Sequence, residues 1–282
     1  MRIPRGNYGQ SLRSQTPLDC TPMRTTIKLN VPLVSTCVAL ITSCLLSAAA
    51  INVDIQGANA GGPGFNLHVG TYTGQAVPVT GTTWNGVAYQ GVVSSTLVDD
   101  LGATTDVNFW SQANLNEWSY DAGGGGVNLT AEALMADYAF ANGSNNHFTL
   151  FSNVADGGSG LQLTTGSTWD VYVYMQGDTA GQGATLTLNY AGGASSTAST
   201  TGDGPWNGTF VEGGNYVKFS GVSPRAYTVS GTNNGYEFDF VWGLNGGSAA
   251  GINGIQLVQV PEPGTAALLG GAGILSLFRR RR

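Results

Sequence analysis

Alternation of aromatic and acidic side chains is clearest in the stretch Glu237-Phe238-Asp239-Phe240-Val241-Trp242. Successive side chains of a β-strand point to opposite faces of the sheet, so the three aromatic side chains share one face. The two carboxylates share the other face with Val241. We expect the aromatic face to lie in the core of a two-layer structure.

A second stretch, Asp170-Val171-Tyr172-Val173-Tyr174-Met175, alternates in the same way. Its aliphatic side chains share one face, which we expect to be buried. Tyr172 and Tyr174 share the opposite face, where they either lie under another element or form an exposed platform for a sugar. Burial is favoured, because strands of a two-layer sandwich often have both faces partly covered.

Strand-like runs recur along the chain and are separated by clusters of Gly, Asn, Ser, Thr and Asp, which are typical of turns. The other runs are residues 51–55, 87–93, 147–151, 184–190, 215–220, 227–230 and 254–260. The single helical candidate is residues 130–140, where Thr130 can cap and Leu134, Met135 and Tyr138 fall near helical spacing. We therefore predict a mainly β domain, an antiparallel β-sandwich with one short helix, over residues 51–259.

The amino end has the order of a secretory signal peptide. A basic start at Met23, with Arg24 and Lys28, precedes an apolar run over residues 31–46. Ser47-Ala48-Ala49-Ala50 then supplies the small residues of a cleavage site, with Ala48 and Ala50 as its determinants. Residues 23–50 are predicted to be the signal peptide, cut after Ala50. Residues 1–22 show no hydrophobic pattern and are predicted to be disordered, upstream of the true start.

The cysteines bear on both lipidation and redox chemistry. Ile41-Thr42-Ser43-Cys44 also satisfies a loose lipobox, which would make Cys44 a lipidated amino terminus. All three cysteines precede Ile51. After cleavage at Ala50 the domain has no thiol and no disulfide.

Charge is strongly asymmetric between the domain and its flanks. The whole chain has a formal net charge of -6, yet within residues 51–259 the only cations among Lys and Arg are Lys218 and Arg225. An acidic surface repels nucleic acid phosphates and anionic lipid headgroups. It tolerates divalent cations and neutral sugars, and nucleic acid is not an expected partner.

Catalytic motifs are sparse. The expected domain has only His68 and His147, and His147 stands at the entrance to a strand, where we expect a surface position. A glycoside hydrolase needs two carboxylates at a suitable separation. The nearest approach to a cluster is Asp99, Asp100, Asp106, Glu117 and Asp121. No catalytic residue is assigned, and a hydrolase stays as an alternative.

Tryptophans are the candidate sugar-binding residues. Trp110 and Trp118 flank that acidic region, where they either line a glycan cleft or are core residues beside solvated loop acids, the alternative that the usual burial of tryptophan favours. Trp206 stands in a proline and glycine turn, where it is the better exposed candidate. Aromatic ring faces stack on sugar C–H groups, while carboxylates accept sugar hydroxyls. Oxygen-rich loops at Asp99-Asp100, residues 156–158 and Asp203-Gly204 leave a structural calcium open as a cofactor.

The carboxyl end has three parts. Pro261-Glu262-Pro263 precedes an uncharged apolar run over residues 265–278, and Arg279, Arg280, Arg281 and Arg282 end the chain. Fourteen helical residues would span roughly 21 Å, less than a bilayer core of about 30 Å. The terminal arginines would hold that end in the cytoplasm. We predict a short hydrophobic membrane helix within residues 260–282.

This order resembles the PEP-CTERM sorting signal of Gram-negative bacteria. The resemblance implies export, recognition of Pro261, Glu262 and Pro263 by a membrane protease called an exosortase, and a topology signal in the four arginines. It implies three partners: the secretion machinery, the exosortase, and the membrane before processing.

Four further segments look like those of exported planctomycete-type PEP-CTERM proteins. They are residues 134–140, 169–174, 216–220 and 251–258. That resemblance implies a galactose-binding-like jelly roll, and carbohydrate binding by analogy. The chain is thus interpreted as an exported, non-catalytic protein of the cell surface or extracellular matrix that binds polysaccharide; a purely structural envelope protein remains the other alternative.

Overall fold

The computed structural model describes the β-rich part of the chain between Ala49 and Pro261. The described residues are 49–56, 69–70, 83–88, 93–94, 96–112, 116–119, 134–135, 137–141, 143, 145–153, 160–204, 206–229 and 233–261. The predicted amino-terminal segments up to Ala48 and the tail from Glu262 onward, with its expected helix, lie outside this part.

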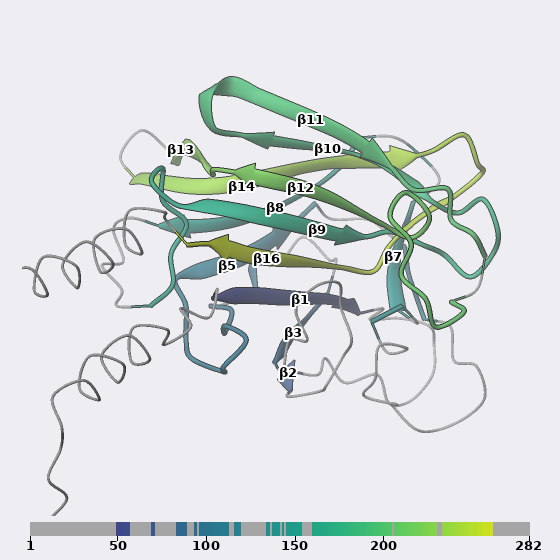
Figure 1. The fold of residues 1–282 in the computed structure, drawn as a ribbon, viewed down its shortest axis with the longest axis horizontal. Coiled ribbons are helices and arrows are strands. Elements are labelled where there is room, and N and C mark those ends of the chain that lie inside the picture. The colour runs from purple at the N-terminus through teal and green to yellow at the C-terminus, as the bar shows by residue number, and fades with distance from the viewer. Residues whose placement is uncertain are drawn as a thin grey trace, which may run out of the picture. The chain divides into compact units, whose positions relative to one another are not determined.

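One layer is a six-stranded sheet (Figure 1). Its strands in spatial order are β12 (Tyr216–Val222), β9 (Thr168–Tyr174), β16 (Gly254–Val260), β1 (Ala50–Gln56), β3 (Trp84–Ala88) and β2 (Val69–Gly70). Every neighbouring pair is antiparallel except β1 and β3, which are parallel with Val53 opposite Asn85. The predicted run 254–260 has the same bounds as β16.

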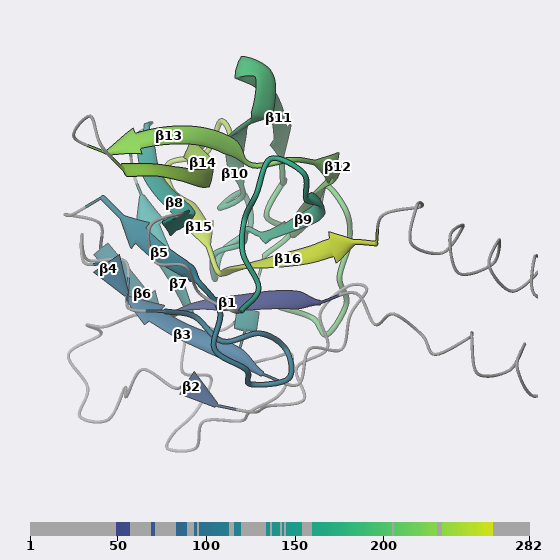
Figure 2. The same ribbon diagram turned by 90° about the vertical axis from the view of Figure 1, so that its left-hand side faces the viewer.

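The other layer is a seven-stranded antiparallel sheet. Its strands in order are β11 (Ala194–Ser199), β10 (Ala184–Tyr190), β14 (Asn233–Leu244), β8 (Asn146–Asn153), β5 (Val107–Ser111) and β4 (Val93–Ser94), and β13 (Arg225–Val229) also pairs with β14. A short 3-10 turn, η2 (Ala191–Gly193), joins β10 to β11. Figure 2 shows β14, β8 and β5 in a different layer from β16 and β1.

The core lies between these two sheets. Phe238, Phe240 and Trp242 on β14 are fully buried in it, which confirms the sequence prediction. Val171, Val173 and Met175 enter the same core from the opposite sheet, again as predicted. The stacked rings of Phe148 and Phe240, with centroids 4.5 Å apart, belong to it. The predicted fold class, a mainly β and largely antiparallel sandwich, is therefore confirmed.

The helix predicted over residues 130–140 is wrong for its last four residues. Leu134 and Met135 are helical, but Asp137–Ala141 form strand β7. This strand pairs with β6 (Asn116–Ser119) and β15 (Ala250–Ile252) in a third sheet. Ala139 and Ala141 alternate into the main core, so long-range pairing overrides the local helical spacing.

A second apolar cluster lies on the outer face of the six-stranded sheet. Tyr172 and Tyr174 are only 4% and 0% exposed, and they pack there with Trp84, Leu134 and Tyr216. The segment after β11 covers part of this face, since the ring of Phe210 lies 5.3 Å from that of Tyr174. The alternative that placed these tyrosines under another element is confirmed, and they are not an exposed sugar platform.

Candidate functional site

The outer face of the seven-stranded sheet carries a charged cluster on β14. Alternation turns Glu237 and Asp239 away from the core, yet they are only 9% and 5% exposed. Three neighbouring strands cover them with polar side chains. Arg225 on β13 lies opposite Glu237, Asn189 on β10 lies opposite Asp239, and His147 reaches Asp239 from β8.

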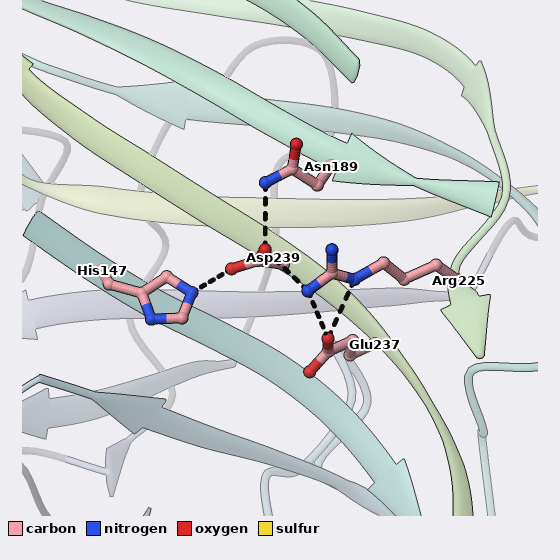
Figure 3. Close-up of polar contacts among 5 residues, drawn as sticks. All are labelled: His147, Asn189, Arg225, Glu237 and Asp239. Carbon is pink, nitrogen blue, oxygen red and sulfur yellow. Dashed lines mark hydrogen bonds and ion pairs between the residues drawn. The ribbon is translucent and has the colours of Figure 1, made fainter. Parts of the chain in front are cut away.

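Every member of this cluster is hydrogen-bonded to another (Figure 3). Arg225 donates to Glu237 Oε1 from Nε at 2.9 Å and from Nη2 at 2.7 Å. The same Nη2 lies 2.7 Å from Asp239 Oδ2, which also accepts a bond from Asn189 Nδ2 at 2.9 Å. His147 Nε2 contacts the other oxygen, Asp239 Oδ1. We call these five residues the Asp239 cluster.

The partners of Asp239 determine its ionisation. Burial on its own raises the pKa of this carboxyl, but hydrogen bonds from His147 and Asn189 and the charges of His147 and Arg225 hold the pKa below its ordinary value. Asp239 is therefore ionised at neutral pH. One guanidinium and one imidazole face two carboxylates in this cluster.

Trp110 flanks the cluster from β5. Val107, Phe109 and Ser111 of that strand point inward, so Trp110 points outward and is half-buried. Its ring meets the imidazole of His147 edge-on, with centroids 5.5 Å apart and an interplanar angle of 74°. Trp110, Thr149, Asp239 and Asn189 lie directly opposite one another on four adjacent strands. Three strand spacings of about 4.8 Å make this row roughly 14 Å long.

The three candidate tryptophans do not come together. Trp206, expected to be the better exposed one, is half-buried as Trp110 is, with its ring centroid 4.5 Å from that of Phe210, on the cluster over the six-stranded sheet. An apolar neighbour four residues away in the same loop gives the indole a surface to cover. Trp118 is on β6 of the third sheet, and its side chain lies outside the described residues.

The described acidic residues near Trp110 in the sequence bond to the chain around them. Asp99 Oδ1 accepts bonds from the backbone of Leu101 at 2.9 Å and of Ala103 at 2.8 Å. Asp100 Oδ1 accepts the amide of Ala50 at 3.2 Å, and Asp106 contacts Gln162. The side chain of Glu117, and Asp121 as a whole, lie outside the described residues.

In the described part of the chain, no group of three or more His, Cys, Asp or Glu side chains is placed to hold a metal, and this includes the described candidate calcium loops. Asp203 Oδ1 accepts a bond from Thr201 at 2.6 Å, within its own loop. Residues 156–158 and His68 are outside the described residues. Structural calcium stays a prediction.

The predicted processing residues lie at the two ends of the described part. Ala50, expected to be the last residue of the signal peptide, is the fully buried first residue of β1. Pro261 is exposed and follows directly on β16. Among the described residues, no helix is long and apolar enough to cross a membrane. Ala48, Glu262, Pro263 and the four terminal arginines fall beyond them.

Sequence reasoning missed the Asp239 cluster. Alternation placed both carboxylates on the outer face, but their partners are distant in the sequence: His147 is 92 residues from Asp239 and Asn189 is 50. His147 was expected in a turn or surface position at the entrance to a strand; it is the second residue of β8 and is half-buried. The one available signal was that Lys218 and Arg225 are the only Lys or Arg residues in a domain with many acids.

Comparison with known proteins identifies the tail. Residues 259–282 match the model of the PEP-CTERM protein-sorting motif. The chain carries this sorting motif, as the sequence predicted, and the motif indicates export and sorting to the cell envelope or surface. No curated protein matches the chain.

Several solved structures are similar to the β-rich part. The CBM36-1 domain of a multidomain xylanase from the hindgut metagenome of Trinervitermes trinervoides is 12% identical, with 55% of this chain and 99% of that chain covered and a TM-score of 0.29. CBM36 in complex with calcium and xylotriose is 12% identical, with coverages of 52% and 91% and a TM-score of 0.28. The insecticidal delta-endotoxin Cry8Ea1 from Bacillus thuringiensis is 14% identical, with coverages of 52% and 24% and a TM-score of 0.28. Similarity at this level does not assign a function.

Proposed function

We propose that this is an exported protein, sorted by an exosortase through its PEP-CTERM tail, whose β-sandwich binds a neutral glycan chain without cleaving it. The sandwich would be of the galactose-binding-like jelly-roll class. The observation that carries the binding proposal is the half-buried Trp110 beside the Asp239 cluster on the outer face of the seven-stranded sheet.

Support for a sugar comes from the chemistry along the row of opposed residues. An indole offers an apolar surface for the C–H groups of a sugar ring. The half-buried Asn189 adds an amide at the other end of the row, within the reach of one short oligosaccharide, while Thr149 and Asp239 lie buried between the two. Arg225 and His147 fix the Asp239 carboxylate by hydrogen bonds, so binding costs little side-chain ordering.

Support for a neutral ligand comes from charge. In the Asp239 cluster the one guanidinium, that of Arg225, is bonded to two carboxylates. The rest of the domain is strongly acidic, so a uronate or sulfated chain would be repelled. A polysaccharide of unmodified hexoses or pentoses fits this face.

A non-catalytic role is favoured by the ionisation of Asp239. A glycosidase needs one carboxyl held protonated as general acid, with a raised pKa. The pKa of Asp239 is lowered, and both carboxylates of the cluster are bonded to Arg225. Neither is placed to donate a proton to a leaving group.

The test is Trp110→Ala in the full-length chain, assayed by electrophoretic retardation in gels containing xylan, galactan, mannan or β-glucan. We expect the wild-type chain to be retarded by at least one of these and the variant to lose that retardation. The variant should unfold at nearly the wild-type temperature, since Trp110 lies outside both buried clusters.

Trp206→Ala is the matched control. It removes the other described tryptophan that is half-buried, and its packing on Phe210 means that it should lower the melting temperature while retardation persists. Equal retardation of wild type and Trp110→Ala would refute the site. Release of reducing ends from the polysaccharide that retards the protein would instead support the hydrolase alternative.

A further inference from the structure

The strand β11 ends the seven-stranded sheet on one side. It pairs with β10 from Thr185 opposite Ser199 to Tyr190 opposite Ala194, and among the described residues no strand pairs with its other edge. Figures 1 and 2 show β11 at the outer end of its sheet, beyond β10. The backbone groups on this outer edge are therefore the candidates for a partner.

The register fixes which backbone groups face outward. Thr200 N donates to Ala184 O at 2.9 Å, and this pair continues the β10–β11 register by one residue. Hydrogen-bonded and non-hydrogen-bonded pairs alternate in an antiparallel ladder. Counting back from Thr200, the residues whose N–H and C=O point away from β10 are Ser195, Thr197 and Ser199. Their side chains are exposed as well.

This edge lacks the features that normally prevent sheet extension, which are charge, proline and bulges. The six residues are Ala194-Ser195-Ser196-Thr197-Ala198-Ser199. The edge strand of the other sheet, β12, has such features: Lys218 lies on it, the register shifts between Phe219 and Val222, and Gly221 has a φ of 65°. The two edges of one sandwich are thus differently protected.

Charge also singles out this edge. Residues 179–202 contain no Asp, Glu, Lys or Arg, although the domain around them is strongly acidic. Two copies of an acidic protein repel each other least where they approach through an uncharged segment. A second copy of this chain is therefore the partner that the edge fits.

We infer that two copies of this protein pair through β11, antiparallel about a twofold axis at Thr197. Side chains of opposed residues lie on the same face of a sheet, and a twofold axis normal to the sheet keeps each face on its own side. The residue at the axis must therefore lie opposite its own copy. Thr197 then faces Thr197 of the second copy, and Ser195 faces its Ser199. Each of these pairs exchanges two backbone hydrogen bonds, and the two seven-stranded sheets become continuous.

Pairing about this axis turns the outer faces of both sheets to the same side. Asn189 lies opposite Ser195, so the row that begins at Trp110 extends to the paired edge. The two copies of the Trp110 face would then bind one polysaccharide surface together and gain avidity. The association itself is independent of whether the face binds a glycan.

The register is tested by cysteine cross-linking of the full-length chain in which Cys20, Cys37 and Cys44 are replaced by Ser. Opposed residues in a hydrogen-bonded pair have Cα atoms about 5.5 Å apart, within disulfide range. On mild oxidation T197C should form disulfide dimers by itself. S195C should form them only when mixed with S199C.

S220C is the matched control, because Ser220 is an exposed serine on the edge strand β12. It should remain monomeric under the same oxidation. Equal cross-linking of T197C and S220C would overturn the inference, and so would cross-linking of S195C alone at the level of the mixture.

Sedimentation of the unoxidised protein gives a second measurement. T197P removes the outward N–H donor from both copies and leaves the ladder to β10 intact, as proline on an edge strand does. Two lost hydrogen bonds of about 1 kcal/mol each correspond to a rise of roughly thirtyfold in the dimer dissociation constant. A wild-type chain that stays monomeric at every concentration, or a T197P chain that dimerises as wild type does, would overturn the proposal.

Discussion

Asp239 shows how single residues make the outer face of the sheet rigid. Its carboxylate is 5% exposed and is bonded to side chains from three other strands, β8, β10 and β13. A buried carboxylate is costly unless it is paired and hydrogen-bonded. The Asp239 cluster meets that requirement by joining four strands across the sheet. The same bonds fix the polar groups next to Trp110.

Arg225→Met should destabilise the protein by about 2 kcal/mol, less than a fully buried pair because Arg225 is 35% exposed. The substitution leaves Glu237 and Asp239 without their cation. Chemical denaturation measures the change. Lys218→Met is the control: Lys218 pairs with Asp170 at 2.7 Å with side chains 29% and 24% exposed, and its loss should cost at most about 1 kcal/mol. Equal losses would contradict the structural role of the cluster.

Stability should fall at acid pH in a way that depends on Asp239. Its pKa is lower in the folded than in the unfolded protein, so its contribution is complete above the unfolded value of about 4 and is lost as pH falls through the folded value. Urea unfolding between pH 6 and pH 2.5 should show a smaller acid loss for Asp239→Asn than for wild type. Parallel curves would show that Asp239 is not the group involved.

At the scale of elements, alternation predicted strands better than spacing predicted the helix. Phe238, Phe240 and Trp242 point to the core as expected, because a period of two fixes the face of a strand wherever it pairs. Residues 137–140 read as helical but form β7, since pairing with β15 depends on residues more than 100 positions away along the chain. Such pairing leaves no local signal.

Strand β11 was missed for a related reason. Its sequence has no large apolar residue, and its outer face is held by side-chain hydroxyls, with Thr187 Oγ1 and Thr197 Oγ1 2.8 Å apart. Hydrophobic periodicity cannot detect a strand stabilised by hydroxyl pairs on an exposed hairpin. The Asp239 cluster was missed because its partners converge only after the strands pair.

Gly254→Ala should destabilise the protein by about 1 to 3 kcal/mol, as overpacking of a closed site does. A Cβ at Gly254, where β16 begins, would meet Val53 O at 2.5 Å and Leu134 Cδ1 at 2.7 Å. The matched substitution Gly166→Ala meets nothing within 4 Å and should be nearly neutral. Thermal unfolding of both variants is the measurement. If the β1–β16 junction were loosely packed, both variants would unfold at the wild-type temperature.

At the scale of the whole molecule, the sandwich ends where the sorting motif starts. β16 finishes at Val260, and the matched motif spans residues 259–282. Pro261 lacks the N–H that a hydrogen-bonded strand needs, which accounts for the end of β16 at Val260. Folding and sorting are therefore encoded in adjacent segments. The tail could be predicted from local sequence because its three parts are contiguous, whereas the residues of the site come together only when the strands pair.

Deletion of Arg279–Arg282 should impair sorting without affecting the fold. The apolar run would lose the charges that hold its end in the cytoplasm, and unprocessed protein should be released into the medium. Immunoblotting of cell-surface and medium fractions measures this. Replacement of the four arginines by lysines, which keeps both the charge and the length of the tail, is the matched control. Unchanged surface yield and processing after loss of the arginines would contradict the proposed topology.

The location of the glycan site is tested most directly by fluorine NMR of the full-length chain labelled with 5-fluorotryptophan. The six tryptophans give probes on both sheets, and Trp→Phe variants assign their signals. The titrant is an oligosaccharide of the polysaccharide that retards the chain in gels. We predict a saturable shift of the Trp110 signal and unchanged signals for Trp169, Trp242 and Trp206. A saturable shift of Trp206 with Trp110 unmoved would contradict the account and place the site on the opposite sheet.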